Sequence, residues 1–343
     1  MPRAFTVVML PLLAAAALVP AASAPFDAFL RTAPYELIAG SDPDRWCGEG
    51  DDAYVGDDSA DLRGVHFALS LDCLIQEESV PDRLAGEVPA LEHVPAAAPG
   101  TEFLIVRVAH QARYFPEIGS SPHTTQSWIM AGDRRIYVGA VPAAGKFLVL
   151  SVPTGAETVL WIEDSGRAQG LDLRTGAQVD PVTGYYGGPG FQAKTSEEIE
   201  FVDVEFGTSR RWWTMDCYAD PATITRTMWT ERLGWAEEGT AFLTVEWWWC
   251  GEGTFDDTTW ALDKEEALEV MVGTEPAELL DWSERPSGAA WGGAVHTVSF
   301  AVPLDAREFR VLFTPVGEVT ELANGEVHQI RGRPAPAVWT MSY

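Results

Sequence analysis

Hydrophobic and polar residues alternate along many short stretches of this chain. Val298, Phe300 and Val302 alternate with smaller or polar residues, and the stretches 243–249 and 309–313 alternate in the same way. A period of two with one apolar side is typical of a half-buried β-strand. Glycine, proline and aspartate separate these short stretches, which predicts an antiparallel sandwich.

Only one segment carries a helical signal. Residues 263–270, with the sequence DKEEALEV, predict a short helix. The rest of the chain is expected to form strands and turns.

The pattern also repeats along the chain. Gly100–Val108 and Gly239–Trp247 share five of nine residues at an offset of 139, and the stretches 147–153 and 297–303 both end in Val-Pro. A repeat this long favours a duplicated domain over a solenoid, whose periods are about 20 to 50 residues. We therefore expect an all-β protein of two tandem immunoglobulin-like antiparallel β-sandwiches after a signal peptide.

The boundary between the two copies is expected near residues 184–190. Four glycines and a proline fall within this stretch, and they cannot continue a strand ladder. The predicted divisions are a signal peptide (1–24), a loop-like N-terminal segment (25–64), the first sandwich (65–183), a Gly-rich linker (184–197) and the second sandwich (198–343), which carries an insertion near 251–294.

The N-terminus has the pattern of a secretory signal peptide. Arg3 precedes the apolar stretch 5–19, and Ala22-Ser23-Ala24 is a small-residue cleavage motif. Pro25 disfavours cleavage directly before it, so cleavage after Ala21 is the alternative. The apolar stretch is shorter than the about 20 residues of a comfortable membrane span. We expect a secreted, extracellular protein without stable membrane insertion.

The formal net charge is −28, from 51 acidic and 23 basic residues. This field repels phosphate backbones and excludes nucleic acid as a partner. The charge favours a role in solubility, and a cation or a cationic partner is the functional alternative. The expected partner is an unidentified protein or glycan.

The four cysteines are Cys47, Cys73, Cys217 and Cys250. An even count in an exported chain predicts two disulfides. The domain division favours Cys47–Cys73 and Cys217–Cys250 among the three possible connectivities. Cys250, however, falls on the more polar side of its predicted strand, which leaves the second pairing open.

Several segments of the first copy resemble a known group of domains. These segments are Gly100–Val108, Gly132-Asp133 with Tyr137, and Gly145–Pro153. They are similar to the telokin-like, immunoglobulin-like extracellular domains of secreted actinobacterial and other Gram-positive proteins. The resemblance is clearer over 65–185 than over 200–335. It implies a fold and a compartment, but no shared catalytic site.

No catalytic motif stands out in the chain. The six histidines show no metal-ligand spacing, and the acidic stretch 48–61 does not match a calcium loop, so it is expected to be a solvated loop. We expect no enzyme activity, no catalytic residue, no cofactor and no metal. A hydrolase with a non-standard site is the least favoured alternative.

Tryptophan is abundant, and eleven of the fourteen lie in the second copy. In the runs 212–213 and 247–249, strand alternation directs at least one ring to the outer face. Trp212 and Trp248 are therefore the candidate ligand-binding residues, although such rings also pack inside cores or against a neighbouring domain. The sequence favours a secreted, non-catalytic binding or structural protein. The alternative is a carbohydrate-binding module that uses the tryptophans of the second domain.

Overall fold

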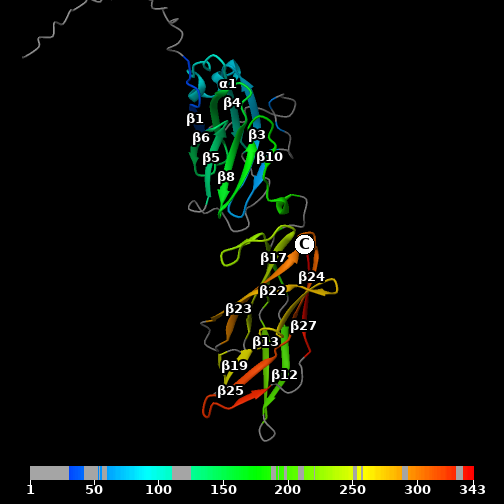
Figure 1. Ribbon diagram of the computed structural model, residues 1–343. Helices are drawn as coiled ribbons and strands as arrows, with labels where there is room; N and C mark the ends of the chain where they lie inside the picture. Colours follow the sequence, from blue (N-terminus) through cyan, green and yellow to red (C-terminus); the bar gives the residue numbers. More distant parts are fainter. Residues whose placement is uncertain are drawn as a thin grey trace, which may run out of the picture.

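The computed structural model describes residues 31–41, 53, 55, 60–109, 125–186, 191, 193–196, 199–207, 212–219, 221–249, 253–255, 258–287, 293–329 and 335–343. Residues 193, 199–207, 212–219, 253–255, 258 and 329 are described by their backbone alone. Within these residues the protein is almost entirely antiparallel β-structure (Figure 1), which confirms the all-β prediction.

Residues up to 179 form two five-stranded sheets. Sheet I has the order β1-β7-β4-β3-β2, and sheet II has the order β10-β9-β8-β5-β6. The strands are β1 (Leu37–Ser41), β2 (Asp61–Arg63), β3 (Ala68–Glu77), β4 (Thr101–Val108), β5 (Thr125–Ala131), β6 (Arg134–Gly139), β7 (Lys146–Pro153), β8 (Thr158–Asp164), β9 (Arg167–Asp172) and β10 (Gln178–Val179).

Sheet I is buried on both faces. One face packs on sheet II through residues such as Leu104 and Ile129. The other face carries Phe103 and Phe147 and is covered by the segment around Leu84, which contains the helix α1 (Asp82–Glu87) and the 3-10 turn η2 (Pro89–Leu91). Sheet II is thus an outer layer of this half of the protein.

The N-terminal segment 25–64, expected to be loop-like, supplies two strands in its described part. β1 pairs with β7 along its whole length, and β2 pairs with β3. The backbone of Gly40 lies against the ring of Phe147, because a Cβ at Gly40 would be 2.2 Å from Cζ of Phe147. The strand β1 has no hydrophobic alternation, so only its pairing with β7 defines it.

Residues from 193 onward form three further sheets and a small ribbon. Sheet III has the order β11-β14-β17-β13-β12 with β23 and β22 added beside β17, sheet IV has the order β18-β19-β25-β26, sheet V has the order β21-β20-β24-β27, and β15 pairs with β16. The strands are β11 (Ala193–Thr195), β12 (Ile199–Gly207), β13 (Trp212–Ala219), β14 (Thr223–Thr227), β15 (Trp229–Thr230), β16 (Gly234–Trp235), β17 (Thr240–Trp249), β18 (Gly253–Phe255), β19 (Thr258–Leu262), β20 (Leu268–Val272), β21 (Glu275–Pro276), β22 (Glu278–Pro286), β23 (Ala294–Pro303), β24 (Glu308–Phe313), β25 (Gly317–Glu321), β26 (Val327–Gln329) and β27 (Ala337–Ser342).

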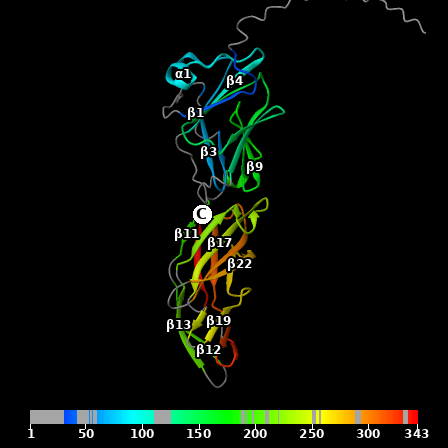
Figure 2. The ribbon, with the colours of Figure 1, turned by 90° about the vertical axis from the view of Figure 1, so that its left-hand side faces the viewer.

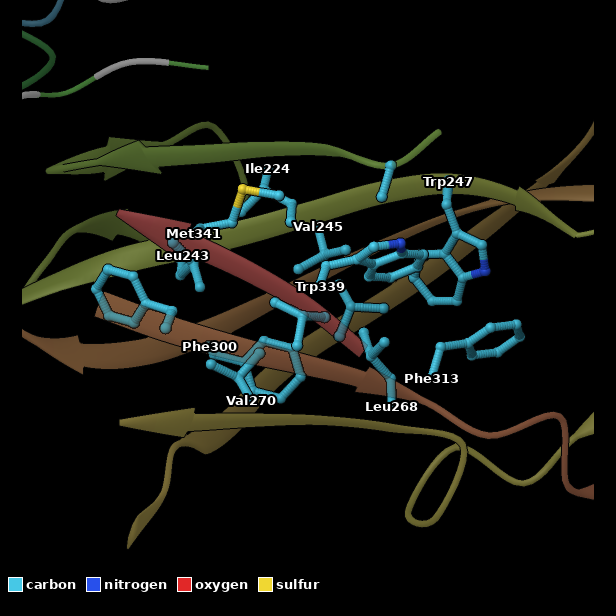
Figure 3. Close-up of a cluster of buried hydrophobic side chains, with 14 of the residues drawn as sticks. Ile224, Leu243, Val245, Trp247, Leu268, Val270, Phe300, Phe313, Trp339 and Met341 are labelled. Atoms are coloured by element: carbon cyan, nitrogen blue, oxygen red, sulfur yellow. The ribbon is translucent and has the colours of Figure 1, made fainter. Parts of the chain in front are cut away.

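A single core fills the space between sheets III and V. Leu243, Val245 and Trp247 of β17 meet Val270 of β20 and Trp339 of β27 (Figure 3). Alternate residues of β17 are buried, as its hydrophobic pattern predicts. The burial of Trp247 and Trp249 places most of the indole surface of the run 247–249 in this core.

The expected helix at 263–270 is wrong. Asp263 accepts hydrogen bonds at its backbone oxygen from the N–H of Ala267 (2.8 Å) and at its side chain from the N–H of Glu265 (3.0 Å). This turn leads directly into β20, where Leu268 and Val270 are buried. The local helix propensity of the acidic and alanine residues is overridden because two apolar side chains of a strand fill the core.

The ladders of the two halves share a register. In sheet I, Thr101 lies opposite Pro153, and in sheet III, Thr240 lies opposite Pro303. The residues after the prolines turn in the same way, with Thr154 N–H bonded to the oxygen of Gly100 at 3.1 Å. The equivalent distance from the N–H of residue 304 to the oxygen of residue 239 is 2.9 Å.

The strands that carry the cysteines do not share this register. Cys73 lies opposite Arg107 in sheet I, whereas Glu246, the residue aligned with Arg107, lies opposite Thr223. Cys217 is on the separate strand β13. The similar sequence spacing around Cys73 and Cys217 therefore does not correspond to equivalent positions in the ladder.

Cys73 is disulfide-bonded. Cys47 and Cys250 also lie outside them, and Cys217 is described by its backbone alone. The pairing of the four cysteines remains a prediction.

The two groups of sheets are stacked along one long axis (Figures 1 and 2). Between them the 3-10 turn η3 (Thr183–Tyr185) falls where the sequence predicts the Gly-rich linker, and residues 187–190 lie outside the described residues. Val182 and Tyr185 pack into the core of the C-terminal sheets. The described part of the chain contains no helix with the length and apolar character needed to cross a membrane.

Candidate functional site

A row of aromatic side chains crosses the outer face of sheet II. Trp128 on β5 lies opposite Tyr137 on β6 and opposite Trp161 on β8. Residues directly opposite in an antiparallel ladder place their side chains on the same face, with Cβ atoms about 5 Å apart. We call Tyr137, Trp128 and Trp161 the outer aromatic row.

Strand alternation explains why these rings face outward. On β5, Ser127 and Ile129 point inward and are fully buried, so Trp128 between them points outward and is half-buried. On β8, Leu160 and Ile162 are buried on either side of Trp161. The same alternation therefore sends one ring outward from each strand.

The row continues beyond Trp161 across a glycine. Gly170 on β9 lies opposite Trp161 and opposite Val179 of β10. A Cβ at Gly170 would lie 2.6 Å from Cγ1 of Val159 and 3.3 Å from Cδ2 of Trp161. The indole of Trp161 therefore lies close to the backbone of Gly170, in the space that a side chain there would fill.

Tyr137 is the most exposed ring of the row, with 71% of its surface accessible. Arg135, two residues before it on β6, places its guanidinium carbon 4.1 Å from the centroid of the Trp128 ring. On the other side of the row, Gln126 lies opposite Glu163. The row therefore presents the rings of Tyr137 and Trp161 on either side of Trp128, which Arg135 partly covers, and groups that donate and accept hydrogen bonds border it.

Sequence reasoning did not single out this row. The signal was present, because Trp128 and Trp161 each stand between inward-facing residues of a period-two pattern. The sequence instead favoured a site in the second half of the chain, because most of the tryptophans lie there.

The structure does not bring the two predicted ligand-binding tryptophans together. Trp248 is half-buried and packs against Gly293, where a Cβ would lie 2.6 Å from Nε1 of the indole. Trp212 is described by its backbone alone. Among the described residues, β13 pairs with β17 at Ala219, opposite Trp249, so Trp212 stands seven residues, or roughly 23 Å, along β13 from that point.

A His–Asp–Ser cluster lies at the junction between the two groups of sheets. His66 Nδ1 lies 2.7 Å from Asp164 Oδ1 and 3.4 Å from Ser165 Oγ, and Ser165 Oγ lies 3.2 Å from the same carboxylate oxygen. In a catalytic triad the serine and the aspartate contact opposite nitrogens of the imidazole. Here both contact Nδ1, so the cluster does not have the geometry of a catalytic triad.

The same cluster connects the two groups of sheets. The ring of Trp229 meets His66 edge-on at 5.1 Å, and Trp235 donates its indole N–H to the backbone oxygen of Ser165 at 3.0 Å. The backbone N–H of Arg63 donates to the hydroxyl of Tyr186 at 2.9 Å. Burial raises the pKa of Tyr186, so its hydroxyl remains available for this contact even at alkaline pH.

His296 is buried among tryptophan rings in the core of the C-terminal sheets. Its ring stacks on Trp247 with centroids 4.9 Å apart, and Trp282 donates its indole N–H to Nδ1 at 3.2 Å. Burial, aided by the charge of Lys264, lowers the pKa of His296 to about 4. The imidazole is neutral at physiological pH and acts as a core residue.

One group of side chains among the described residues has the spacing of metal ligands. One ligand atom each from Glu321, Glu326 and His328 lies within 4.8 Å of the others on the hairpin β25–β26. Asn324 donates to one carboxylate oxygen of Glu321 at 2.7 Å, and Glu326 is exposed. The other oxygen of Glu321 lies 3.8 Å from Nε2 of His328, the distance of a loose ion pair.

Comparison with protein-family models found no match, and a search of curated proteins found no similar sequence.

Proposed function

We propose that this protein acts outside the cell as a non-catalytic binding protein and that its ligand contacts the outer aromatic row. The N-terminal signal-like pattern supports the location. The row supports the binding function, because exposed aromatic rings on a rigid sheet are the side chains that contribute most at recognition surfaces.

The observation that carries the proposal is the exposure of Tyr137 beside two outward-facing indoles. A ring needed only for the fold would be expected inside one of the cores, as Trp247 and Trp249 are. Leaving three rings accessible to water forgoes hydrophobic stabilisation, which a ligand recovers when it covers them.

We infer that the two groups of sheets are immunoglobulin-like sandwiches that arose by duplication, with disulfides Cys47–Cys73 and Cys217–Cys250. The shared register at Thr101–Pro153 and Thr240–Pro303 supports the duplication. The resemblance to telokin-like extracellular domains is consistent with a binding or structural role at the cell envelope.

The test uses the whole secreted chain with the double substitution Tyr137→Ser and Trp161→Ser. Binding is measured to immobilised polysaccharides and to an immobilised random peptide library. The matched control is Leu322→Ser, which removes an exposed apolar side chain from the C-terminal sheets, where Leu322 is 53% exposed. We expect the double variant to lose whatever the parent and the control bind. Equal binding by all three proteins would refute the assignment of the site.

A further inference from the structure

We infer that the outer aromatic row binds a neutral polysaccharide chain, with sugar rings stacked on Trp161 and Tyr137 and with the guanidinium of Arg135, which lies over Trp128, donating to sugar hydroxyls between them. This inference rests on the proposed binding function and adds the chemical class of the ligand. It places sugar binding on the first group of sheets rather than on Trp212 and Trp248.

The geometry of the row suits a linear chain of rings. The three aromatic residues lie on adjacent strands β8, β5 and β6 at directly opposed positions. Adjacent strands are about 4.8 Å apart, so the row extends roughly 10 Å from Trp161 to Tyr137 across the strands. A ligand that matches it is narrow, extended and built from flat apolar faces at short regular intervals, as a chain of pyranose rings is.

The apolar area of the row is too small for a stable protein interface. At roughly 150 to 250 Å² per aromatic side chain, one largely exposed and two half-buried rings present on the order of 300 Å². A standard protein–protein interface buries about 800 Å² on each partner. A sugar chain needs only the ring faces, together with polar groups at their edges.

Those polar groups stand on both sides of the row. Gln126 and Glu163 lie opposite each other on β5 and β8, one side-chain position from the indoles. Arg135 lies on the other side, over Trp128. The equatorial hydroxyls of a pyranose ring both donate and accept hydrogen bonds, so amide, carboxylate and guanidinium groups at the rim all find partners.

The charges on this face favour a neutral chain. This face carries one positive and one negative group beside the rings, Arg135 and Glu163, and the chain as a whole carries a net charge of −28. An acidic polysaccharide or a phosphate-rich ligand would be repelled by that field. A neutral polysaccharide is not repelled by this field.

Two of the three rings, those of Trp128 and Trp161, are also held in place before binding. The guanidinium of Arg135 lies over the ring of Trp128, and the indole of Trp161 lies close to Gly170. Side chains that are already ordered lose little conformational entropy when a ligand arrives. The row therefore resembles a rigid platform more than an adaptable surface.

The experiment measures retention of the full chain by cellulose, chitin, xylan and a β-1,3-glucan, with alginate as the acidic comparison. Affinity electrophoresis and pull-down give the dissociation constants. The variants are Trp161→Ala, Tyr137→Ala and Trp161→Phe. The controls are Leu322→Ala and Trp248→Ala, and thermal unfolding verifies that each variant is folded.

We expect the parent to bind at least one neutral polysaccharide and not alginate. Trp161→Ala and Tyr137→Ala should each weaken binding about tenfold or more, as removal of a central recognition residue does. Trp161→Phe keeps a stacking face and should lose less, while both controls should bind as the parent does.

The inference is overturned if the parent binds none of the neutral polysaccharides, or if Trp248→Ala abolishes binding and Trp161→Ala leaves it intact. If the parent binds a peptide but no polysaccharide, and the double substitution Tyr137→Ser and Trp161→Ser abolishes peptide binding, then the row is the binding site and only the ligand class is refuted. Self-association that depends on Tyr137 and Trp161, seen by analytical ultracentrifugation, would also overturn it and identify the row as a contact between copies.

Discussion

The substitution His296→Asn tests the core of the C-terminal sheets most sharply. His296 is fully buried, stacks on Trp247 and accepts a hydrogen bond at Nδ1 from the indole N–H of Trp282. Protonation would set an N–H against that donor and bury a charge. Asparagine offers an acceptor oxygen near the position of Nδ1 but does not titrate.

The sign of the effect follows from the pKa of His296. Its folded value of about 4 lies below the ordinary value of 6.5. Below the ordinary value the unfolded chain gains a proton that the folded chain does not, so this contribution to stability is fully present above pH 6.5 and is lost as the pH falls toward 4. At about 1.4 kcal/mol for each pKa unit, the loss by about pH 4.5 is about 2 to 3 kcal/mol.

The assay is urea unfolding of the parent and of His296→Asn at about pH 7.5 and about pH 4.5. At the higher pH the variant should be less stable, because it loses the stacked ring. At the lower pH the difference should shrink by about 2 to 3 kcal/mol, because only the parent pays for keeping the site neutral. Carboxylates titrate in both proteins and cancel in the comparison. A difference in unfolding free energy that does not change with pH would refute the reasoning. The variant Trp282→Phe, which removes the hydrogen-bond donor to His296, should show a pH dependence of stability between those of the parent and His296→Asn.

Three further substitutions have defined outcomes. Gly40→Ala forces a Cβ into the buried ring of Phe147 and should lower the free energy of unfolding by about 1 to 3 kcal/mol, measured by urea titration; an unchanged midpoint would contradict the packing of β1 on β7. Burial raises the pKa of Glu102, but hydrogen bonds from a backbone N–H and from Arg174, which lies 2.6 Å away, outweigh burial and lower the pKa. Arg174→Met should therefore raise the pKa of Glu102, measured by NMR titration. The stability that the lowered pKa provides, present above pH 4.5 and lost as the pH falls through the folded pKa, should then shrink; a titration curve for Glu102 that does not move would count against the contact. Trp235→Phe removes the indole hydrogen bond across the junction and should broaden the distance distribution between the two groups of sheets in small-angle scattering, so an identical profile would show that this contact does not hold them together.

Much of the architecture could be predicted from the sequence because strand alternation is local. The period-two patterns at 243–249, 297–302 and 309–313 gave strands with the expected buried faces. The same logic failed at 263–270, where helix-forming residues close a turn and start a strand. Strand β1 was missed because it has no alternation of its own and is defined by its partner.

The site depended on pairing that no local pattern specifies. Alternation alone directs Trp128 and Trp161 outward, but their meeting with Tyr137 in one row requires the register of β6, β5 and β8. The contact of His66 with Asp164, 98 residues away, is likewise set by tertiary structure.

Side-chain direction along a strand follows from the geometry of the extended backbone, so the sequence by itself determined which residues of each strand face inward. Which outward residues become neighbours depends on hydrogen-bonded ladders between distant segments and on the cores that align them. Only the folded sheets could therefore place three rings from separate strands in a single exposed line.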